Sequence, residues 1–437
     1  MLIKFYRSLH RSEFLKSVFV LLSGTLIAQF ISYALTPIIS RQFTPEEMGQ
    51  FGIYQRWLVL IATIATARYE FSLPLPKKDE HSFLIYRLAL FTSFITILLT
   101  IISTFLFGLL SAKPLDYYLW IGLLILGVAS TAFFSIGTNW AIRNKQFNLI
   151  TSSKIYNSLV MNFSRVGFGF LKFGKWGLIA SFLLAVIVSS LNFSKSFFQA
   201  RKKLNTSASK KKMFVLARKY KDFPLVNLPH ALSDNIRDLL IALIISDFFS
   251  ERIFGSFDFT FRMLRLPVML IGVSLSQVLF NRIADSKRNG SYLFPIVKKV
   301  FLLLVGISIL PFTIIYFFGE PIFIYVFGQN WSESGKLSEL MAPWLMFNFL
   351  ISPLSVIPLV LEKQRGFFAL ALISSVTQIL GFLFLPYLFT NSREGTYQVF
   401  HVVSISQVLF SSLVLVYIFR IIKNEDRKNN SNPKIIT

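Results

Sequence analysis

Residues 195–221 read KSFFQARKKLNTSASKKKMFVLARKYK, and this basic stretch lies between two long apolar halves of the chain. It holds ten of the 45 Lys and Arg residues. Short loops rich in Lys and Arg stay on the cytoplasmic side of a membrane because they resist translocation. The stretch therefore predicts a polytopic membrane protein whose central linker lies in the cytoplasm.

The regions on both sides of this linker are apolar over long distances. Mean hydropathy is +0.60 over 437 residues, and only 15% of them are charged, which is less than a soluble chain of this length carries. About 20 helical residues cross the roughly 30 Å hydrocarbon layer of a bilayer. Eight uncharged windows meet this length: 17–40, 88–112, 117–142, 176–194, 300–319, 340–361, 366–392 and 395–419. Four apolar segments that carry charges join them: 45–67, 149–171, 222–247 and 253–281.

The sequence thus predicts an all-α polytopic membrane protein with twelve transmembrane helices, six on each side of the linker. The predicted parts are an N-terminal six-helix lobe (1–199), a basic cytoplasmic linker (200–221), a C-terminal six-helix lobe (222–423) and a cytoplasmic tail (424–437). An even number of helices returns each half to the side on which it began. Both termini are therefore predicted in the cytoplasm.

Charge counting supports this orientation. Of the 45 Lys and Arg residues, 33 fall in the termini, the linker and the loops predicted on its side. Five more are Arg residues inside apolar segments, and the opposite side holds only Arg41, Lys113, Lys172, Lys175, Arg252, Lys336 and Arg393. This bias places both termini and the central linker in the cytoplasm.

Several other classes of function find little support. A net charge of +24 suggests nucleic acid in a soluble protein, but here its distribution follows membrane topology and attraction to anionic lipid. Cysteine is absent, which excludes disulfides and thiolate metal sites. The four histidines (His10, His81, His230 and His401) have no paired spacing, so neither a metal nor another cofactor is predicted. No extramembrane segment is long enough for a catalytic domain, so the chain is predicted not to be an enzyme.

Five Arg residues inside the apolar segments are the strongest candidates for a binding site: Arg56, Arg165, Arg237, Arg262 and Arg265. An Arg near the bilayer centre costs at least about 2.5–3.5 kcal/mol on insertion scales, so each should face a partner or a watered cavity. Asp258 precedes Arg262 by four residues and Asp234 precedes Arg237 by three, spacings that allow structural pairs on one helix face. The other interpretation is that several of the five line a pathway for an anion.

Acidic residues near these cations are candidates for coupling or gating. Glu70 lies in TARYEFSLPLPKKDE, at the cytoplasmic end of the second predicted helix. It has two interpretations, a helix-end salt bridge or loop clasp on the one hand and proton coupling or gating on the other. Asp234, Asp238 and Asp258 join it as candidates, with structural pairing as the alternative.

Five stretches resemble one family. They are LLSGTLIAQFISYALTPIISRQFTPEEMGQFGIYQ (21–55), ARYEFSLPLP (67–76), YKDFPLVNLPHALSDNIRDLL (220–240), GSFDFTFRMLRLPVMLIGVSLSQVLFNRIA (255–284) and FGQNWSESGKLSELMAPWLMFNFLISPLS (327–355). In order and spacing they resemble the lipid-linked oligosaccharide flippases, the polysaccharide-transport branch of the multidrug/oligosaccharidyl-lipid/polysaccharide (MOP) exporter superfamily. The resemblance spans nearly the whole chain.

This resemblance implies a MATE-like fold of two six-helix lobes around a central basic cavity, with alternating access. The implied substrate is an undecaprenyl-diphosphate-linked oligosaccharide, carried to the periplasmic leaflet for O-antigen, capsule or exopolysaccharide synthesis. A polysaccharide polymerase and a chain-length regulator are the implied partners, besides the bilayer itself. Arg56, Arg262 and Arg265 match positions where the family places cavity cations, and Arg165 and Arg237 match less closely.

Three alternatives remain open at this point. A drug or cation antiporter of the same superfamily would share the fold but should have an acid-dominated cavity. A membrane glycan polymerase or ligase would have a similar number of helices, but normally with a large outer loop that is absent here. A non-transporting scaffold or receptor is the third alternative.

Overall fold

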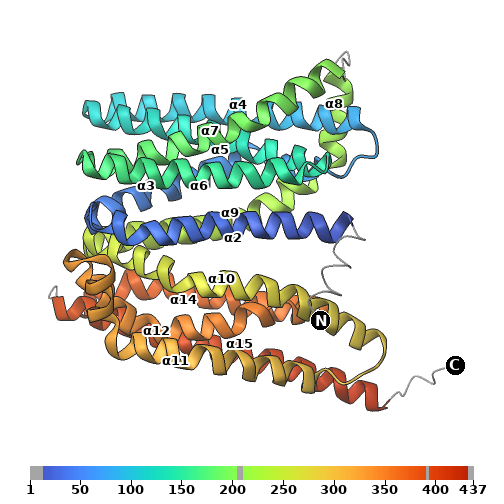
Figure 1. The fold of residues 1–437 in the computed structure, drawn as a ribbon, viewed down its shortest axis with the longest axis vertical. Helices are drawn as coiled ribbons and strands as arrows, with labels where there is room; N and C mark the ends of the chain where they lie inside the picture. The colour runs from blue at the N-terminus through green and yellow to red at the C-terminus, as the bar shows by residue number, and fades with distance from the viewer. Residues whose placement is uncertain (1–12, 204–209, 390–392, 432–437) are drawn as a thin grey trace. The chain divides into compact units, whose positions relative to one another are not determined.

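The structure is a computed structural model of the 437-residue chain, and it describes residues 13–203, 210–389 and 393–431 (Figure 1). The described chain is helical, without strands, and falls into two compact units, Met1–Leu239 and Leu240–Thr437. Twelve of its helices have at least 21 residues, which confirms the twelve predicted from hydropathy. Two further helices, α8 (Lys210–Lys219) and α13 (Ile357–Val360), are short.

The first unit contains six long helices and the start of a seventh. They are α2 (Glu13–Ser40), α3 (Pro45–Ala65), α4 (Asp79–Leu110), α5 (Leu115–Arg143), α6 (Phe147–Phe170), α7 (Gly174–Lys203) and, at its beginning, α9 (Leu228–Phe248). A 3-10 turn, η1 (Tyr69–Ser72), follows α3, and a π-helical turn, η2 (Phe223–Asn227), precedes α9. The helix α7 packs against α3, α5 and α6, and so forms the centre of this unit.

The second unit is built around α12 (Ser332–Leu354). This helix packs against α10 (Glu251–Arg288), α11 (Phe294–Phe327) and α15 (Arg393–Ser431), while α14 (Gln364–Leu388) packs on α15. A short 3-10 turn, η3 (Gln329–Trp331), joins α11 to α12. Half of the most apolar window of α12 is buried, compared with 11% for α14. The side chains of α14 are therefore mostly exposed within the second unit.

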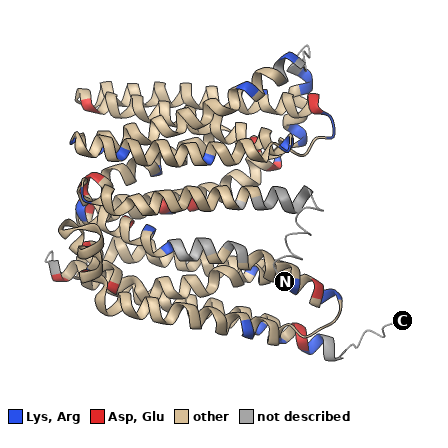
Figure 2. Cartoon of the chain, viewed as in Figure 1, with Lys and Arg blue, Asp and Glu red and all other residues tan. Residues whose placement is uncertain are grey.

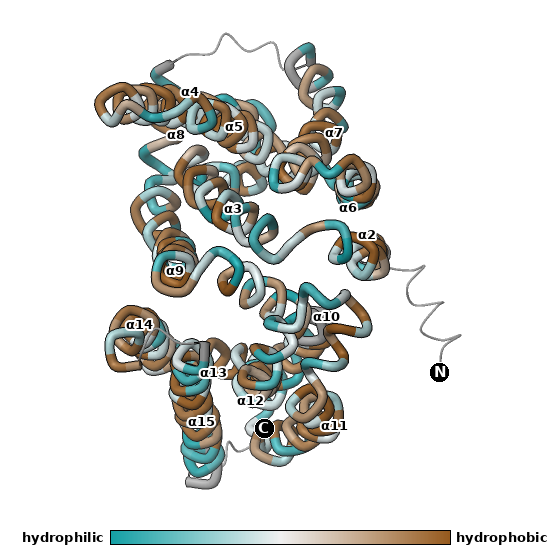
Figure 3. The backbone as a smooth tube through the Cα atoms, turned by 90° about the vertical axis from the view of Figure 1, so that its left-hand side faces the viewer, coloured by the Kyte–Doolittle hydropathy of each residue, from teal (hydrophilic) through white to brown (hydrophobic). Residues whose placement is uncertain are grey.

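Seven helices in the described part are long and apolar enough to cross a membrane: α4, α5, α7, α11, α12, α14 and α15. The tubes of α4 and α11 are mostly brown in Figure 3, in agreement with their high hydropathy. The charged helices α3, α6, α9 and α10 are not among the seven, because ionisable side chains lower their hydropathy. These four coincide with the apolar segments that carry charges in the sequence, and all five candidate Arg residues lie on them.

Local sequence fixes where α3 begins. Thr44 accepts a hydrogen bond from the Glu47 backbone N–H (3.3 Å), and the Glu47 carboxylate accepts one from the Thr44 N–H (2.9 Å). This reciprocal capping box satisfies two of the backbone donors that a helix start leaves open. Pro45 occupies the first helical position, where its missing N–H costs nothing. The turn FTPEE therefore starts the helix that carries Arg56.

Several helices are longer than, or shifted from, the hydropathy windows. The window 253–281 lies within α10, which runs to Arg288, and the window 340–361 corresponds to α12, which begins at Ser332. Charges predicted in loops consequently lie on helices, among them Arg87, Arg282, Lys298 and Lys299. Helices continue beyond the hydrocarbon layer into water, where charged side chains no longer oppose insertion, and hydropathy windows find only the apolar part.

Candidate functional site

The candidate site residues form groups in each unit, on α3, α6 and α9 of the first unit and on α10 of the second, and Arg56 is the first of them. Its Nε donates to the backbone carbonyl of Asp238 on α9 (3.1 Å), and its Nη1 donates to the carbonyl of Gly52 one turn earlier on α3 (3.1 Å). Arg56 is half-buried. These two hydrogen bonds place the Arg56 guanidinium where α3 meets α9.

Arg237 lies one residue away from this contact, on α9. Its guanidinium pairs with Asp238 (2.9 Å) and, at longer range, with Asp234 (3.6 Å). The pair with Asp234 is the one predicted from the i, i+3 spacing. Both carboxylates are more than half exposed, so this network is open to solvent. Arg56 and Arg237 therefore meet at Asp238, as two cations beside two acids.

Two more polar contacts are made by α3 and by the turn that follows it. Asn235 Nδ2 on α9 donates to Thr63 Oγ1 on α3 (2.9 Å), and Arg68 Nε in the turn donates to Asn227 Oδ1 in η2 (3.0 Å). Together with Arg56 they form a row of hydrogen bonds along α3 and the turn after it. This row fixes the part of α9 that carries Arg237.

Arg165 is the most buried of the five candidates, with 9% of its surface exposed. Its guanidinium carbon lies 5.2 Å from the centre of the Phe51 ring on α3, a cation–π arrangement. Arg165 continues a polar stripe on α6 that includes Lys154, Ser158 and Asn162. Residues spaced by three or four fall on one face of a helix, which places these side chains together.

This stripe faces α2. Ser158 Oγ donates to the Ala28 carbonyl (2.6 Å), and Asn162 Nδ2 donates to Ser32 Oγ (3.0 Å). Lys154 Nζ donates to Thr25 Oγ1 (3.1 Å) and is half-buried. Hydrogen bonds of this kind hold helices together where lipid supplies no hydrophobic driving force between them.

Lys154 is a cation that the sequence analysis leaves out of the candidate set. It is one of the 33 Lys and Arg residues that the charge count assigns to termini, linker and loops, and that assignment is wrong, because Lys154 lies two turns inside α6. The signal that identifies it is its spacing of eleven residues from Arg165, about three full turns of helix. It adds a sixth basic side chain to the candidate set.

Arg262 and Arg265 lie on α10 in the second unit. Arg262 forms the predicted i, i+4 ion pair with Asp258 (2.6 Å), in which the carboxylate is well buried and the guanidinium about one third exposed. Arg265 is exposed, and its guanidinium carbon lies 5.5 Å from the Phe261 ring centre. One of these two cations is thus paired with a carboxylate, while the other packs on an aromatic ring.

Glu70 lies in η1, immediately after α3, where Ala67 and Arg68 both adopt left-handed backbone conformations (φ +47° and +60°). Only 2% of Glu70 is exposed, and its Oε2 has no hydrogen-bond partner among the described residues. Burial raises the pKa of this carboxyl above its usual range, and the nearby Thr66 and Arg68 side chains offset only part of that effect. Glu70 is therefore a buried acid, and proton coupling or gating through it stays a prediction beside the loop clasp.

The site residues thus fall into separate groups within the two units. Arg56, Arg237, Asp234 and Asp238 gather in the first unit, and Arg165 and Lys154 share a stripe there. Asp258, Arg262 and Arg265 lie on one helix of the second unit. Within each unit, these groups hold more basic side chains than carboxylates.

The sequence between residues 76 and 336 matches the model of a family described as polysaccharide biosynthesis protein. The match covers more than half of the chain. The chain belongs to this family. The resemblance predicted from the five sequence stretches is thereby confirmed. No curated protein matches this polysaccharide biosynthesis protein in sequence.

Solved structures identify the fold of this polysaccharide biosynthesis protein as that of the MOP superfamily. A multidrug resistance MATE family transporter of that superfamily, in an inward-facing conformation, has a TM-score of 0.67 at 15% identity, covering 92% of this chain and 99% of its own. The lipid II flippase MurJ, in an inward closed conformation, has a TM-score of 0.65 at 18% identity, covering 93% and 90%. A MOP superfamily transporter from Pyrococcus furiosus, described as having a binding pocket of reverse polarity, has 0.53 at 15%, covering 94% and 96%.

Proposed function

We propose that this polysaccharide biosynthesis protein flips undecaprenyl-diphosphate-linked oligosaccharide repeat units from the cytoplasmic to the periplasmic leaflet by alternating access. The observation that carries the proposal is membership of a polysaccharide family by a chain with a MOP transporter fold. The product would serve O-antigen, capsule or exopolysaccharide synthesis. A polysaccharide polymerase and a chain-length regulator are the proposed partners, because they use flipped repeat units.

The basic side chains suit such a substrate. A diphosphate cannot cross hydrocarbon without compensating positive charge, and guanidinium groups bind its oxygens in bidentate fashion. Arg56, Arg165, Arg237, Arg262 and Arg265 lie on apolar helices and would line the path of the headgroup. An outward-moving anion also gains about 2.3 kcal/mol per charge for each 100 mV of interior-negative potential. The site therefore needs to compensate the charge without holding it tightly.

Two features favour a flippase over a drug or cation antiporter of the same fold. The candidate groups are mainly basic, whereas a cation substrate calls for an acidic site. Among the structural neighbours, MurJ is a flippase of lipid II. Glu70, Asp234, Asp238 and Asp258 remain the acids through which an ion could couple to transport, with Glu70 the foremost because it is buried and protonatable.

The proposed location is the inner membrane of a bacterium, with the basic linker and both termini in the cytoplasm. Figure 2 shows Lys and Arg concentrated at the end of the first unit that carries α8. Lys and Arg near membrane-spanning helices stay on the cytoplasmic side. A lipid-linked oligosaccharide assembled in the cytoplasm would therefore approach from this end.

The deciding experiment measures flipping in liposomes that contain the purified protein and a lipid-linked oligosaccharide. Arg56→Ala and Arg262→Ala should each lower the flipping rate about tenfold or more, the scale expected when a charge-assisted hydrogen bond of about 1.5–3 kcal/mol is lost. Arg288→Ala is the matched control, because Arg288 is exposed at the end of α10. Normal flipping by both site variants would overturn the assignment of these cations.

A second assay separates a transporter from a glycan polymerase or ligase. The same liposomes are incubated with lipid-linked repeat units and no added glycosyltransferase. A flippase moves the units between leaflets and leaves their length unchanged. Chain elongation would instead identify an enzyme.

A further inference from the structure

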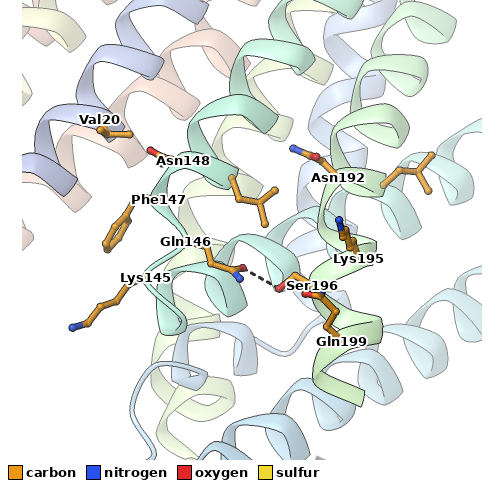
Figure 4. A pocket seen from close by; sticks show the side chains of 11 residues that line it. Val20, Lys145, Gln146, Phe147, Asn148, Asn192, Lys195, Ser196 and Gln199 are labelled. Atoms are coloured by element: carbon orange, nitrogen blue, oxygen red, sulfur yellow. Dashed lines mark hydrogen bonds between the residues drawn. The ribbon is translucent and has the colours of Figure 1, made fainter. Parts of the chain in front are cut away.

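A polar cavity lies in the first unit and is lined by other residues than the candidate site residues. It has a volume of about 650 Å³ and lies between α2, the start of α6 and the last third of α7. Val20 from α2 and Leu191 from α7 form part of its apolar wall, while Lys145 and Lys195 bring positive charge. Figure 4 shows these two lysines on opposite sides of a central hydrogen bond.

The polar part of this cavity is held in place by hydrogen bonds between helices. Ser196 Oγ donates to Gln146 Oε1 (2.9 Å), which ties α7 to the turn before α6. Asn192 Nδ2 donates to Ser153 Oγ (2.8 Å) and to Ser152 Oγ (3.2 Å) on α6. The cavity is thus a feature of three packed helices rather than of a loose loop.

Lys145 and Lys195 place positive charge at the opening of the cavity. Lys145 occupies a left-handed position (φ +56°) in the tight turn between α5 and α6. Both lysines are exposed, so their ammonium groups reach solvent. Among the described residues that line the cavity there is no Asp or Glu, so the lining as described carries a net positive charge.

The cavity lies where the apolar part of the bundle ends. Val20 and Leu191 belong to apolar stretches of α2 and α7, whereas Lys145 lies in the turn that follows Arg143, at the end of α5. A site with an apolar wall on one side and two ammonium groups on the other matches a lipid whose headgroup is anionic and whose chains are apolar. Basic pockets between transmembrane helices on the cytoplasmic side bind phosphate-bearing lipid heads.

We propose that this cavity binds the phosphate headgroup of an anionic phospholipid in the leaflet on the side of the basic linker. Lys145 and Lys195 contact the phosphate oxygens, while the Asn192 amide stays bonded to Ser152 and Ser153 and holds the polar wall in place. Val20 and Leu191 pack against the upper part of the acyl chains. A free phosphate ion shares the headgroup chemistry but makes no use of the apolar wall, so the lipid is the occupant that the lining favours.

The test uses the purified full-length protein in detergent and native mass spectrometry. Phosphatidylglycerol is titrated as the anionic probe and phosphatidylethanolamine as the zwitterionic one. Lys145→Gln combined with Lys195→Gln should weaken phosphatidylglycerol binding roughly 30-fold. This corresponds to a loss in affinity of about tenfold or less for each of the two surface lysines. The matched control is Lys172→Gln combined with Lys175→Gln, the same change of charge in the turn at the other end of α6 and α7. This control should bind like the wild type.

A second variant tests the cavity rather than the charge. Leu191→Trp keeps both lysines but occupies the apolar wall, so it should also weaken phosphatidylglycerol binding. Equal affinity of the double lysine variant and its control would overturn the proposal. Full displacement of the lipid by millimolar inorganic phosphate, with no effect of Leu191→Trp, would overturn it in favour of a simple anion site.

Discussion

At the scale of single residues, the turn after α3 concentrates strain and a buried acid in a few positions. Ala67 and Arg68 adopt left-handed conformations, which cost L-residues of order 1–3 kcal/mol each and persist only where surroundings enforce them. Arg68 is held by Asn227 and lies over the Phe71 ring, with 4.4 Å between its guanidinium carbon and the ring centre. The Tyr69 hydroxyl donates to the Ala217 carbonyl on α8 (3.3 Å). These contacts attach Glu70 to the linker segment.

Glu70 should therefore make stability depend on pH. Because burial raises its pKa in the folded state above the usual 4.5, the folded protein binds this proton more tightly than the unfolded chain does. The free energy of unfolding then falls as pH rises through the window between the two pKa values. Glu70→Gln should melt like the wild type at pH 4 and at a higher temperature than the wild type at pH 8.

The measurement is thermal unfolding in detergent at both pH values. Glu80→Gln provides the control, since Glu80 is an exposed carboxylate at the start of α4. Its melting temperature should follow that of the wild type at each pH. A Glu70→Gln variant with the same pH dependence as the wild type would contradict the buried-acid assignment.

At the scale of elements, one carboxylate connects α15 to the start of α11 in the second unit. Asp426 on α15 accepts hydrogen bonds from the backbone N–H groups of Leu293 (2.8 Å) and Phe294 (2.9 Å), where α11 begins. It acts as a helix cap supplied from another helix, and it is 8% exposed. Asp426→Ala should lower the free energy of unfolding by about 1–2 kcal/mol, the usual cost of losing a cap.

This prediction is checked by chemical or thermal unfolding of the purified variant. Glu425→Ala removes the same charge from the neighbouring position and should change stability by less than about 0.5 kcal/mol, as most substitutions outside such features do. Equal loss in the two variants would show that charge, rather than capping, is responsible.

The contact between α11 and α12 depends on a glycine. A Cβ added to Gly335 would lie 2.4 Å from the Cα of Glu320, a backbone atom with little freedom to move. Gly335→Ala should therefore push the helices apart and cost about 1–3 kcal/mol. Gly306 on α11 is the control, because a Cβ added there would meet no heavy atom of the described chain within 4 Å. Gly306→Ala should leave stability unchanged or raise it by up to about 1 kcal/mol, and thermal unfolding distinguishes the two outcomes.

At the scale of the whole molecule, hydropathy and spacing predict much of the architecture. Twelve apolar segments correspond to twelve long helices, and the i, i+4 spacing identifies the pair of Asp258 and Arg262. Both results depend on regularities within one segment. Such regularities are visible in the sequence because every residue of a helix follows the same geometry.

What the sequence does not reveal depends on partners from other segments. Hydropathy misses the start of α12 at Ser332 because Glu333, Lys336 and Glu339 interrupt the uncharged run, yet Glu333 is buried and accepts a hydrogen bond from Tyr397 on α15. Charge places Lys154 in a loop for the same reason, although Thr25 on α2 accepts its hydrogen bond. A polar residue within a helix is tolerated in the membrane when another helix satisfies it, and hydropathy does not include that contribution.

The orientation of the whole chain is the remaining prediction, and the absence of cysteine makes it directly testable. Ser111→Cys places a single thiol in the exposed turn between α4 and α5, on the side opposite the basic linker. Asn424→Cys places one at an exposed position of α15, in the part of the chain predicted to lie in the cytoplasm with the linker. Because 33 Lys and Arg residues oppose only seven, a membrane-impermeant maleimide should label the first variant in intact cells and the second only after lysis. The reverse pattern would place the basic linker outside, so that a lipid-linked oligosaccharide made in the cytoplasm would meet the end of the bundle with few basic residues.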